Sequence, residues 1–356
     1  MATAARKWAM PSSRPCRGRA TLCCAVALLP ARVLAGPRLF SNVASKYAPL
    51  RHDAELFEPS RLAEWLHPEF AEAVAAIRNA ETSADAAVLA RSFAHEESNG
   101  IYSFPLLTAA ACNRLLAEVD AFAESGLPAR RPNSMNMYGL VLNEIGLKPS
   151  LSALQEAVHV LARELWPTEG ATFDDHHSFV VSYKPDEDRG LDMHTDDSDV
   201  TLNVCLGKEF DAAGLTFCGE MGAPAHRKQS FRYKHVRGQA LLHLGRQRHG
   251  ADDIAAGHRV NLIMWNWNRA YRQSPAYIRR SFAREASAPD AQCVSFTHDR
   301  DYEEIAGKLR PPVGGKPSRF GETAWCPPPH AEYDGFVGTA GRYRDLLEPK
   351  GEQPLN

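Results

Sequence analysis

Long apolar runs are missing from the sequence: none reaches the roughly 18 residues that a helix needs to cross a bilayer. The sequence also lacks internal repeats and the motifs GxGxxG, GxxxxGK[ST], GxSxG and HExxH. These absences exclude a polytopic membrane protein, and they remove the usual signals of dinucleotide-binding, phosphate-loop, serine-hydrolase and zinc-hydrolase proteins. Apolar residues still make up 44% of the chain, which is enough for a large buried core and argues against a disordered protein.

Acidic residues are absent from the first 45 positions, which contain seven Lys and Arg residues. The rest of the chain carries 34 basic and 43 acidic residues and is therefore acidic, although the formal net charge of the whole chain is only −2. A nucleic-acid backbone requires a basic surface, so we expect no nucleic-acid partner. The eight cysteines are scattered without CxxC spacing, which indicates neither a disulfide framework nor a zinc ribbon.

Residues 1–45 read as a targeting leader. A basic stretch ends at Arg19, an apolar run follows as far as Leu29, and small residues near Ala35 offer a cleavage point. The same composition suits an organelle transit peptide, so secretion and organelle targeting have similar weight, beside an uncleaved, disordered N-terminus. We expect residues up to about Ala35 to be cleaved or disordered.

Helical periodicity dominates residues 53–167, which we expect to support the core. Residues 60–94 predict one or two amphipathic helices, and Thr108 can cap a helix that runs to Ser125 and stops at Gly126. A third helix is expected from about Ser150 to Trp166. These helices are most simply a layer packed on the outside of a sheet.

After residue 167 the pattern changes to short β segments without long helices between them, which favours an antiparallel jelly roll over a parallel βαβ sheet. We therefore predict a mostly β fold, a double-stranded β-helix with a helical buttress, in residues 168–270. Residues 271–356 are rich in Pro and Gly and predict a loosely packed tail. The expected strands are Ser178–Tyr183, Val200–Leu206, Leu215–Cys218, Phe231–Val236, Gln239–Leu244 and Arg259–Trp267.

Three residues of the β region have the types and spacing of metal ligands. His194 and Asp196 are two residues apart, so on a strand their side chains project from the same face. His249 follows a segment with the composition of a buried strand. Two imidazoles and one carboxylate on one face of an ion form the facial triad of non-haem Fe(II) oxygenases, which leaves three coordination positions open.

Arg259 strengthens this interpretation because it stands ten residues after His249 at the start of a strand. Alternation places Arg259, Asn261 and Ile263 on one face of that strand and Val260 on the other. A guanidinium directed into a barrel is costly unless it meets an anion, and a ligand carboxylate held by two hydrogen bonds is its natural partner.

The segments His194-Thr-Asp196, Val200–Gly207 and His249-Gly…His-Arg259, with Tyr183 eleven residues before His194, resemble the 2-oxoglutarate- and Fe(II)-dependent dioxygenases of the prolyl and lysyl hydroxylase type. Within that group the chain is most similar to the family of the 2-oxoglutarate and iron-dependent oxygenase domain-containing protein 2. The similarity covers residues 100–268 and includes the segment 131–139.

The resemblance implies roles for six residues. His194, Asp196 and His249 would bind Fe(II), and Arg259 would pair with the C5 carboxylate of 2-oxoglutarate. Tyr183 and Asn203 would hydrogen-bond the same cosubstrate. It further implies O₂ as cosubstrate, ascorbate as reductant, succinate and CO₂ as products, and hydroxylation of an organic substrate, most simply a protein side chain of the Pro or Lys type. A catalytically silent or cupin-like metal-binding protein on the same fold is the alternative.

Other polar residues have plainer interpretations. Asp197 is expected to be solvated or to support the site, and the pair His176 and His177 is more typical of a surface loop than of a metal site. His243 is more easily explained as a core histidine than as a catalytic one.

A loop around Pro132 is as consistent with a substrate entrance, formed by Asn133, Asn136 and Tyr138, as with a simple turn. The tail contains Cys293-x4-His298 and Cys326-x3-His330, whose loose spacing favours coincidence over a zinc site. The identity of the substrate, the compartment and the oligomeric state stay open.

Overall fold

The computed structural model describes residues 42–277, except 134, 222, 224, 225 and 227–229, together with Cys293. Most of the expected leader and nearly all of the expected tail lie outside the described residues. Among the described residues, no helix combines the length and the apolar character that a bilayer crossing demands.

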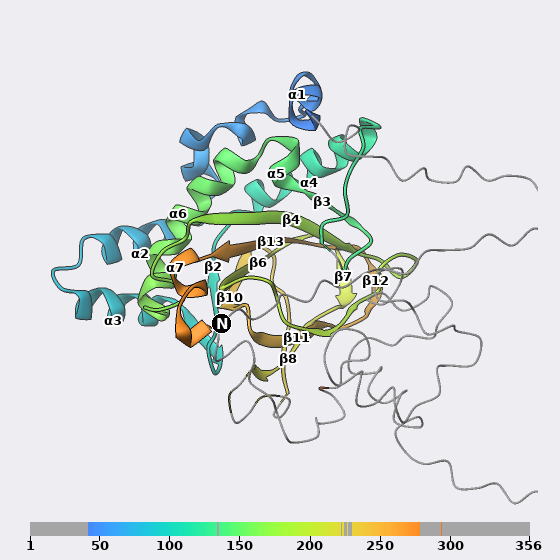
Figure 1. Cartoon of the computed structure of the whole chain (residues 1–356). Helices are drawn as coiled ribbons and strands as arrows, with labels where there is room; N and C mark the ends of the chain where they lie inside the picture. Colours follow the sequence, from blue (N-terminus) through green and yellow to red (C-terminus); the bar gives the residue numbers. More distant parts are fainter. Residues whose placement is uncertain are drawn as a thin grey trace, which may run out of the picture.

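Two antiparallel sheets form the centre of the molecule (Figure 1). The larger sheet has seven strands in the order β1-β2-β10-β6-β13-β4-β3, and the smaller has four in the order β5-β11-β8-β9. A short pair, β7 and β12, lies at one end. The strands are β1 His95–Ser98, β2 Ile101–Pro105, β3 Gly139–Val141, β4 Asp175–Tyr183, β5 Leu191–His194, β6 Val200–Gly207, β7 Phe210–Ala212, β8 Leu215–Glu220, β9 Phe231–Tyr233, β10 Gln239–Leu244, β11 Gln247–Ala251, β12 Ile254–Gly257 and β13 Arg259–Trp267.

This arrangement is a jelly roll, as the sequence predicts. Strands β4, β13, β6 and β10 face β5, β11, β8 and β9, and every pair of neighbours is antiparallel. Side chains from both sheets form one apolar cluster between them, which includes Phe179, Leu191, Leu215 and Ile263. Closing two sheets on each other in this way leaves a lined interior in which a ligand can be enclosed.

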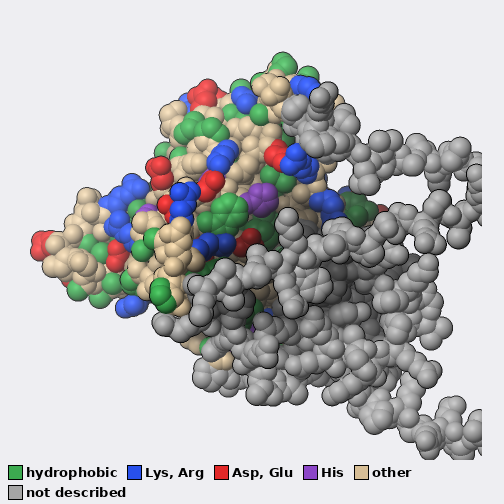
Figure 2. All heavy atoms as spheres, viewed as in Figure 1, with side chains coloured by type: hydrophobic (Ala, Val, Ile, Leu, Met, Phe, Trp, Pro, Cys, Tyr) green, Lys and Arg blue, Asp and Glu red, His purple; other side chains and the backbone are tan. Residues whose placement is uncertain are grey.

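Helices cover the outer face of the larger sheet (Figure 1). They are α1 Val43–Tyr47, α2 Pro68–Arg78, α3 Ser83–Phe93, α4 Ala109–Glu124, α5 Leu142–Ile145 and α6 Lys148–Leu165, with 3₁₀ turns at Ala48–Leu50, Ala54–Phe57 and Pro59–Glu64. One short helix, α7 Arg269–Arg272, follows β13. On the face shown in Figure 2, basic and acidic side chains are interspersed over this helical side.

Two of the predicted helices have nearly the expected bounds. Helix α4 begins after Thr108, whose hydroxyl oxygen accepts a hydrogen bond of 3.1 Å from the amide of Ala111. Helix α6 ends at Leu165, before Trp166 and Pro167. Its buried side chains recur at three- and four-residue intervals because one stripe of the helix packs on the sheet.

Strand β13 shows the alternation that the sequence predicts. Val260 and Leu262 belong to the core between the sheet and the helices, whereas Ile263 belongs to the cluster between the two sheets. Arg259 and Asn261 share the inward face with Ile263 and line the interior. The prediction of an inward-facing Arg259 is therefore confirmed.

The region 53–167 contributes more than helices. Strands β1, β2 and β3 lie in this region, and they extend the larger sheet at both of its edges. Strand β2 pairs with β10 over residues Ile101 to Pro105, so it forms part of the same sheet as the predicted strands. The helical buttress and the β core are thus continuous in structure.

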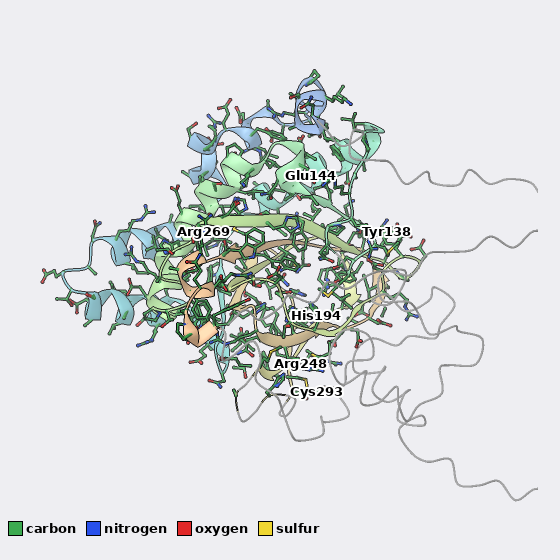
Figure 3. All side chains as sticks on the ribbon, viewed as in Figure 1. Tyr138, Glu144, His194, Arg248, Arg269 and Cys293 are labelled. Atoms are coloured by element: carbon green, nitrogen blue, oxygen red, sulfur yellow. A yellow bond between two sulfur atoms is a disulfide. The ribbon has the colours of Figure 1, made fainter. Side chains whose placement is uncertain are left out.

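One cysteine pair forms a disulfide that the sequence did not predict, although a single bond is not a disulfide framework. Cys218 on β8 is bonded to Cys293, with a Cα–Cα distance of 5.7 Å. The backbone oxygen of Cys293 accepts hydrogen bonds from Nε and Nη2 of the buried Arg248, at 3.2 and 2.8 Å (Figure 3). Because its sulfur is bonded, Cys293 does not serve as a zinc ligand, and the other members of that tail motif lie outside the described residues.

Candidate metal centre and cosubstrate cleft

Two histidines lie side by side on neighbouring strands of the smaller sheet. His194 ends β5 and is the direct cross-strand partner of His249 on β11. Their ring centroids are 4.4 Å apart, and both side chains are buried. Nδ1 of His194 donates to the backbone oxygen of Asp192 at 2.8 Å, and Nδ1 of His249 donates to that of Gln247 at 2.9 Å. With Nδ1 protonated, Nε2 of each ring carries the lone pair, and Nε2 is the atom that can bind a metal ion.

Asp196 completes the cluster, but it does not lie on a strand with His194 as the sequence analysis expects. Strand β5 ends at His194, so Asp196 lies in the connection to β6 and not on the strand. Its amide donates to the oxygen of Gly245 at 2.8 Å, and its Oδ2 accepts a hydrogen bond of 2.7 Å from the Thr201 hydroxyl. The turn and this hydroxyl, rather than strand alternation, aim the carboxylate at the histidines.

The three donor groups converge. Oδ1 of Asp196 lies 3.4 Å from Nε2 of His194, and Oδ2 lies 3.8 Å from Nε2 of His249. One ligand atom from each residue lies within 4.8 Å of the other two. Donors bound to one ion at roughly 2.0–2.2 Å must lie at about this spacing, so the arrangement fits a facial triad.

The local electrostatics give the donors the right protonation. Burial lowers the pKa of His249 to about 3, against the opposite effect of Asp196. Burial acts to raise the pKa of Asp196, but the nearby histidines, His249 first, outweigh it and hold that pKa below its usual value. At neutral pH His249 is therefore a neutral imidazole and Asp196 a carboxylate, which are the forms that bind a divalent cation.

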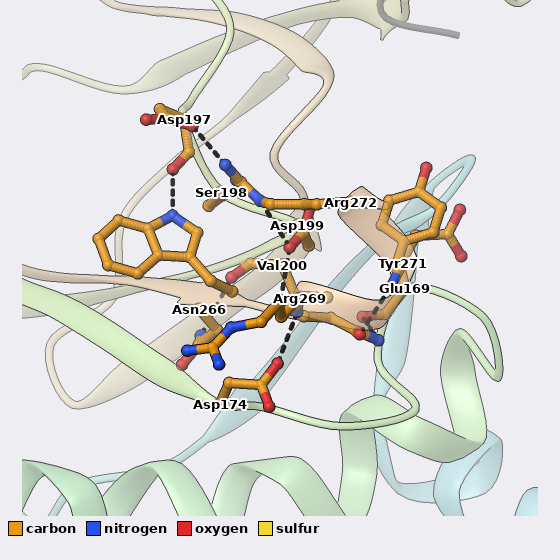
Figure 4. Close-up of polar contacts among 12 residues, drawn as sticks. Glu169, Asp174, Asp197, Ser198, Asp199, Val200, Asn266, Arg269, Tyr271 and Arg272 are labelled. Carbon is orange, nitrogen blue, oxygen red and sulfur yellow. Dashed lines mark hydrogen bonds and ion pairs between the residues drawn. The ribbon is translucent and has the colours of Figure 1, made fainter. Parts of the chain in front are cut away.

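The connection that carries Asp196 is held by an arginine (Figure 4). Arg272 of α7 donates to the exposed Asp197 at 2.8 Å and to the buried Asp199 at 2.9 Å. The backbone oxygen of Asp197 accepts from the Trp267 indole at 2.7 Å. Asp197, Asp199 and Arg272 border a groove that adjoins the triad through Asp196. Asp197 thus supports the connection, as the sequence predicts, and does not join the cluster.

A cleft between the two sheets contains all six residues that the sequence singles out. His194, Asp196 and His249 lie at one part of it, and Arg259, Tyr183 and Asn203 line the same space. Much of the wall of this cleft is apolar, and its apolar side chains include Phe179, Val181, Leu191, Leu215, Ile263 and Trp265. The structure therefore brings together residues that are 76 positions apart in the sequence, from Tyr183 to Arg259.

Arg259 is only 1% exposed, yet within the described residues no carboxylate lies at ion-pair distance from it. Nη1 donates to the backbone oxygens of Ala213 and Gly214, and the guanidinium lies 4.3 Å from the centroid of the Tyr183 ring. Its Nε is buried without a hydrogen-bond partner. A buried cation in this state is costly unless an anion binds beside it, so the cleft fits a ligand with a carboxylate.

His243 has the surroundings of a core histidine. It is fully buried, and its ring packs against Phe217 and His249 at centroid distances of 5.2 and 4.9 Å. The surface-loop interpretation of His176 and His177 is wrong. Both lie on β4, where His176 is buried against Ser178 and Ser152, and His177 donates to the oxygen of Pro132 at 2.8 Å.

The Pro132 loop contributes to the cleft. Asn133 and Asn136 line it, whereas Tyr138 is 42% exposed. Asn261, which sequence reasoning placed inward without assigning it a role, also lines the cleft. Its inward strand phase was the signal that could have identified it.

Comparison with known proteins agrees with this geometry. Residues 43–171 match the OGFOD2-like domain family. The chain is 38% identical over 238 residues to the human 2-oxoglutarate and iron-dependent oxygenase domain-containing protein 2, a match that covers 65% of this chain and 66% of that protein. It is 39% identical over 194 residues to the protein CP2 of the same description from Arabidopsis thaliana, covering 51% of this chain and 49% of the relative.

The chain therefore resembles the 2-oxoglutarate and iron-dependent oxygenase domain-containing proteins. A more distant member of the oxygenases, the mouse procollagen-lysine,2-oxoglutarate 5-dioxygenase 1, is 29% identical over 161 residues, which cover 42% of this chain and 21% of that protein. Matches span about half the length of the two Arabidopsis relatives. The OGFOD2-like match covers α1 to α6 with β1 to β3, so the six candidate residues lie beyond it.

Proposed function

We propose that the protein is a 2-oxoglutarate- and O₂-dependent non-haem Fe(II) dioxygenase that hydroxylates an organic substrate. The observation that carries the proposal is the convergence of His194, Asp196 and His249 in a cleft that also contains the buried Arg259. A protein that only binds metal would gain nothing from burying Arg259 without a carboxylate to pair with it, because an unpaired buried charge is costly. Its family relatives have names that combine the same two components, iron and 2-oxoglutarate.

The residues divide the work as follows. His194, Asp196 and His249 would hold Fe(II) by Nε2 and carboxylate oxygens, and Thr201 fixes the carboxylate. Arg259 would bind the C5 carboxylate of 2-oxoglutarate, with Tyr183 and Asn203 as further hydrogen-bond partners. When bound, iron and 2-oxoglutarate supply the oxidising chemistry that uses O₂, releases succinate and CO₂ and hydroxylates a C–H bond. The apolar walls of the cleft would limit the access of water to the bound cosubstrate.

We further propose that the substrate is a protein side chain of the Lys or Pro type and that ascorbate serves as reductant. The relative named procollagen-lysine,2-oxoglutarate 5-dioxygenase 1 supports a protein substrate. The groove bordered by Asp197, Arg246, Tyr271 and Arg272 adjoins Asp196 from outside, and it offers a place for a peptide next to the metal ligands.

The test is Fe(II)-dependent formation of succinate from 2-oxoglutarate by the purified protein, first alone and then with Lys- and Pro-containing peptide pools. Asp196→Ala is the matched inactive variant. We expect succinate only from the wild type with iron, and more of it, with a mass gain of one oxygen, when a peptide is accepted. A protein that binds metal but neither binds 2-oxoglutarate nor forms succinate would instead be the silent member of the fold.

A further inference from the structure

We infer that Arg272 and Asp199 are positioning residues for the metal site, because they hold the connection between β5 and β6 so that the Asp196 carboxylate faces the two histidines. The inference rests on the proposed function, since it concerns the site for the same Fe(II) ion. Neither residue belongs to the convergent triad, and Arg272 lies on α7, outside both sheets. The basis of the inference is the set of polar contacts drawn in Figure 4.

Asp196 is the candidate ligand that needs support of this kind. The two histidines are fixed by the pairing of β5 with β11, in which His194 and His249 are direct partners. Asp196 lies beyond the end of β5, and its carboxylate oxygen still comes to 3.4 Å from Nε2 of His194. Because Asp196 takes no part in the strand pairing of the described residues, this distance depends on the contacts of the connection itself.

The buried carboxylate of Asp199 joins the connection to α7. The Asp199 side chain is 1% exposed, and Nε of Arg272 donates to both of its oxygens, at 3.1 and 2.9 Å. The amide of Asn268, the N-cap residue of α7, donates to Oδ2 at 2.6 Å. A buried carboxylate is costly unless it is paired and hydrogen-bonded, so the position of Asp199 depends on that of Arg272.

The backbone of Asp199 is bonded to the same residue that holds the backbone of Asp196. That residue is Gly245, in the turn between β10 and β11. Its amide donates to the oxygen of Asp199 at 3.1 Å, and its oxygen accepts from the amide of Asp196 at 2.8 Å. A side chain on Gly245 would collide with the backbone oxygen and the hydroxyl of Ser198, so the turn and the connection are in direct contact. A shift of Asp199 therefore either moves Asp196 or breaks these bonds.

The carboxylate of Asp196 is also supported from this connection. The Thr201 hydroxyl donates to Oδ2 of Asp196 at 2.7 Å. Thr201 has a single hydroxyl hydrogen, so in its 2.6 Å contact with the Ser198 hydroxyl the donor is Ser198. Ser198 directly precedes Asp199 in the chain. Fixing Asp199 thus supports the side chain of Asp196 as well as its backbone.

Arg272→Met is the first variant, because the Arg272 side chain is 25% exposed and Met keeps an apolar stem while removing the donors to Asp199. Arg272→Lys keeps the charge, and Asp199→Asn keeps the shape of the side chain but loses the charge that pairs with Arg272. Asp174→Asn is the matched control. Asp174 also supports α7, by accepting a hydrogen bond of 2.5 Å from the amide of Arg269, but within the described residues it makes no hydrogen bond to the connection.

The measurement is the dissociation constant of Mn(II) by calorimetry, together with the melting temperature and the dissociation constant of 2-oxoglutarate at saturating Mn(II). Loss of a residue that supports a metal ligand predicts that Arg272→Met and Asp199→Asn bind Mn(II) about 10- to 100-fold more weakly. Arg272→Lys should lose less than Arg272→Met, and Asp174→Asn should bind Mn(II) like the wild type even if it melts at a lower temperature. The affinity for 2-oxoglutarate should stay close to that of the wild type in all four, because Arg259, on β13, lies outside the connection.

In an Asp196→Ala background, Arg272→Met should weaken Mn(II) binding much less, because no carboxylate is left to position. If Asp199→Asn does not fold, the partly exposed Arg272 provides the test on its own. Equal Mn(II) affinity in Arg272→Met and wild type, or equal losses for Arg272→Met and Asp174→Asn, would overturn the inference. A wild type that binds Mn(II) but not 2-oxoglutarate would overturn the proposed function instead.

Discussion

Substitution of Arg259 by Ala is the most direct perturbation of the cleft. The guanidinium is buried and meets no carboxylate of the described chain, so its ionic partner must come from a ligand. Losing one member of a buried, hydrogen-bonded ion pair costs on the order of 3–5 kcal/mol. At about 1.4 kcal/mol per factor of ten, the dissociation constant of 2-oxoglutarate should rise by roughly 10²- to 10³-fold.

The same substitution also removes donors to the backbone oxygens of Ala213 and Gly214. Buried carbonyls without partners destabilise a fold by about 1–3 kcal/mol each, so the variant should melt at a lower temperature for a reason unrelated to ligand binding. Arg259→Met loses the same donors but keeps an apolar stem, so comparing it with Arg259→Ala shows how much of the loss comes from packing alone. Arg259→Lys should restore part of the affinity, since an ammonium cannot form the two parallel bonds of a guanidinium.

Calorimetry with Mn(II)-loaded protein measures 2-oxoglutarate affinity, and a titration without 2-oxoglutarate measures metal affinity. We expect Arg259→Ala and Arg259→Met to bind Mn(II) like the wild type, because Arg259 is not part of the convergent triad. If Arg259→Ala instead binds 2-oxoglutarate normally and fails to bind metal, the role assigned to this arginine is wrong.

Three further outcomes are expected. Asp196→Ala should lower Mn(II) affinity at least about 100-fold, and Thr201→Val, which removes only the hydroxyl that holds the carboxylate, about 10- to 100-fold; equal affinity in all three proteins would remove the metal site. Mass spectrometry of an unreduced digest should find Cys218 and Cys293 in one linked peptide, and reduction should lower stability by about 2–5 kcal/mol; two free thiols in the native protein would contradict the pairing. Protein from its native source should begin after about Ala35 on N-terminal sequencing, and an intact Met1 would count against a cleaved leader.

Residue spacing was sufficient to predict the inward face of β13 and to single out His194, Asp196, His249 and Arg259, whereas the family resemblance added Tyr183 and Asn203. Strand alternation is strict, so Arg259 and Asn261 could be placed on the inner face without knowledge of the partner strands. Asp196 shows the limit of this reasoning. It reaches the histidines from a turn, and the side chain that aims it, Thr201, belongs to the next strand.

Long-range contacts explain what the sequence did not reveal. Strand β2 has no alternating pattern because both of its faces are buried: Ile101 packs in the cluster between the two sheets and Phe104 in the core beneath the helices. The bond between Cys218 and Cys293 spans 75 residues, and no local pattern encodes such a pairing. The hydrogen bond between Asn136 and Tyr183 joins positions 47 residues apart. The sequence of the Pro132 loop could therefore suggest a substrate entrance but not this contact.

The direct pairing of His194 with His249 has a thermodynamic consequence. Two of the three candidate ligands are supplied by one cross-strand register, so an ion held by both would join β5 to β11 in the folded state and bind the unfolded chain far less well. Mass action then converts metal concentration into stability, by about 2.7 kcal/mol when free metal is 100 times its dissociation constant. Metal supply would in this way govern how long the smaller sheet stays closed, and with it the survival of the protein against proteolysis.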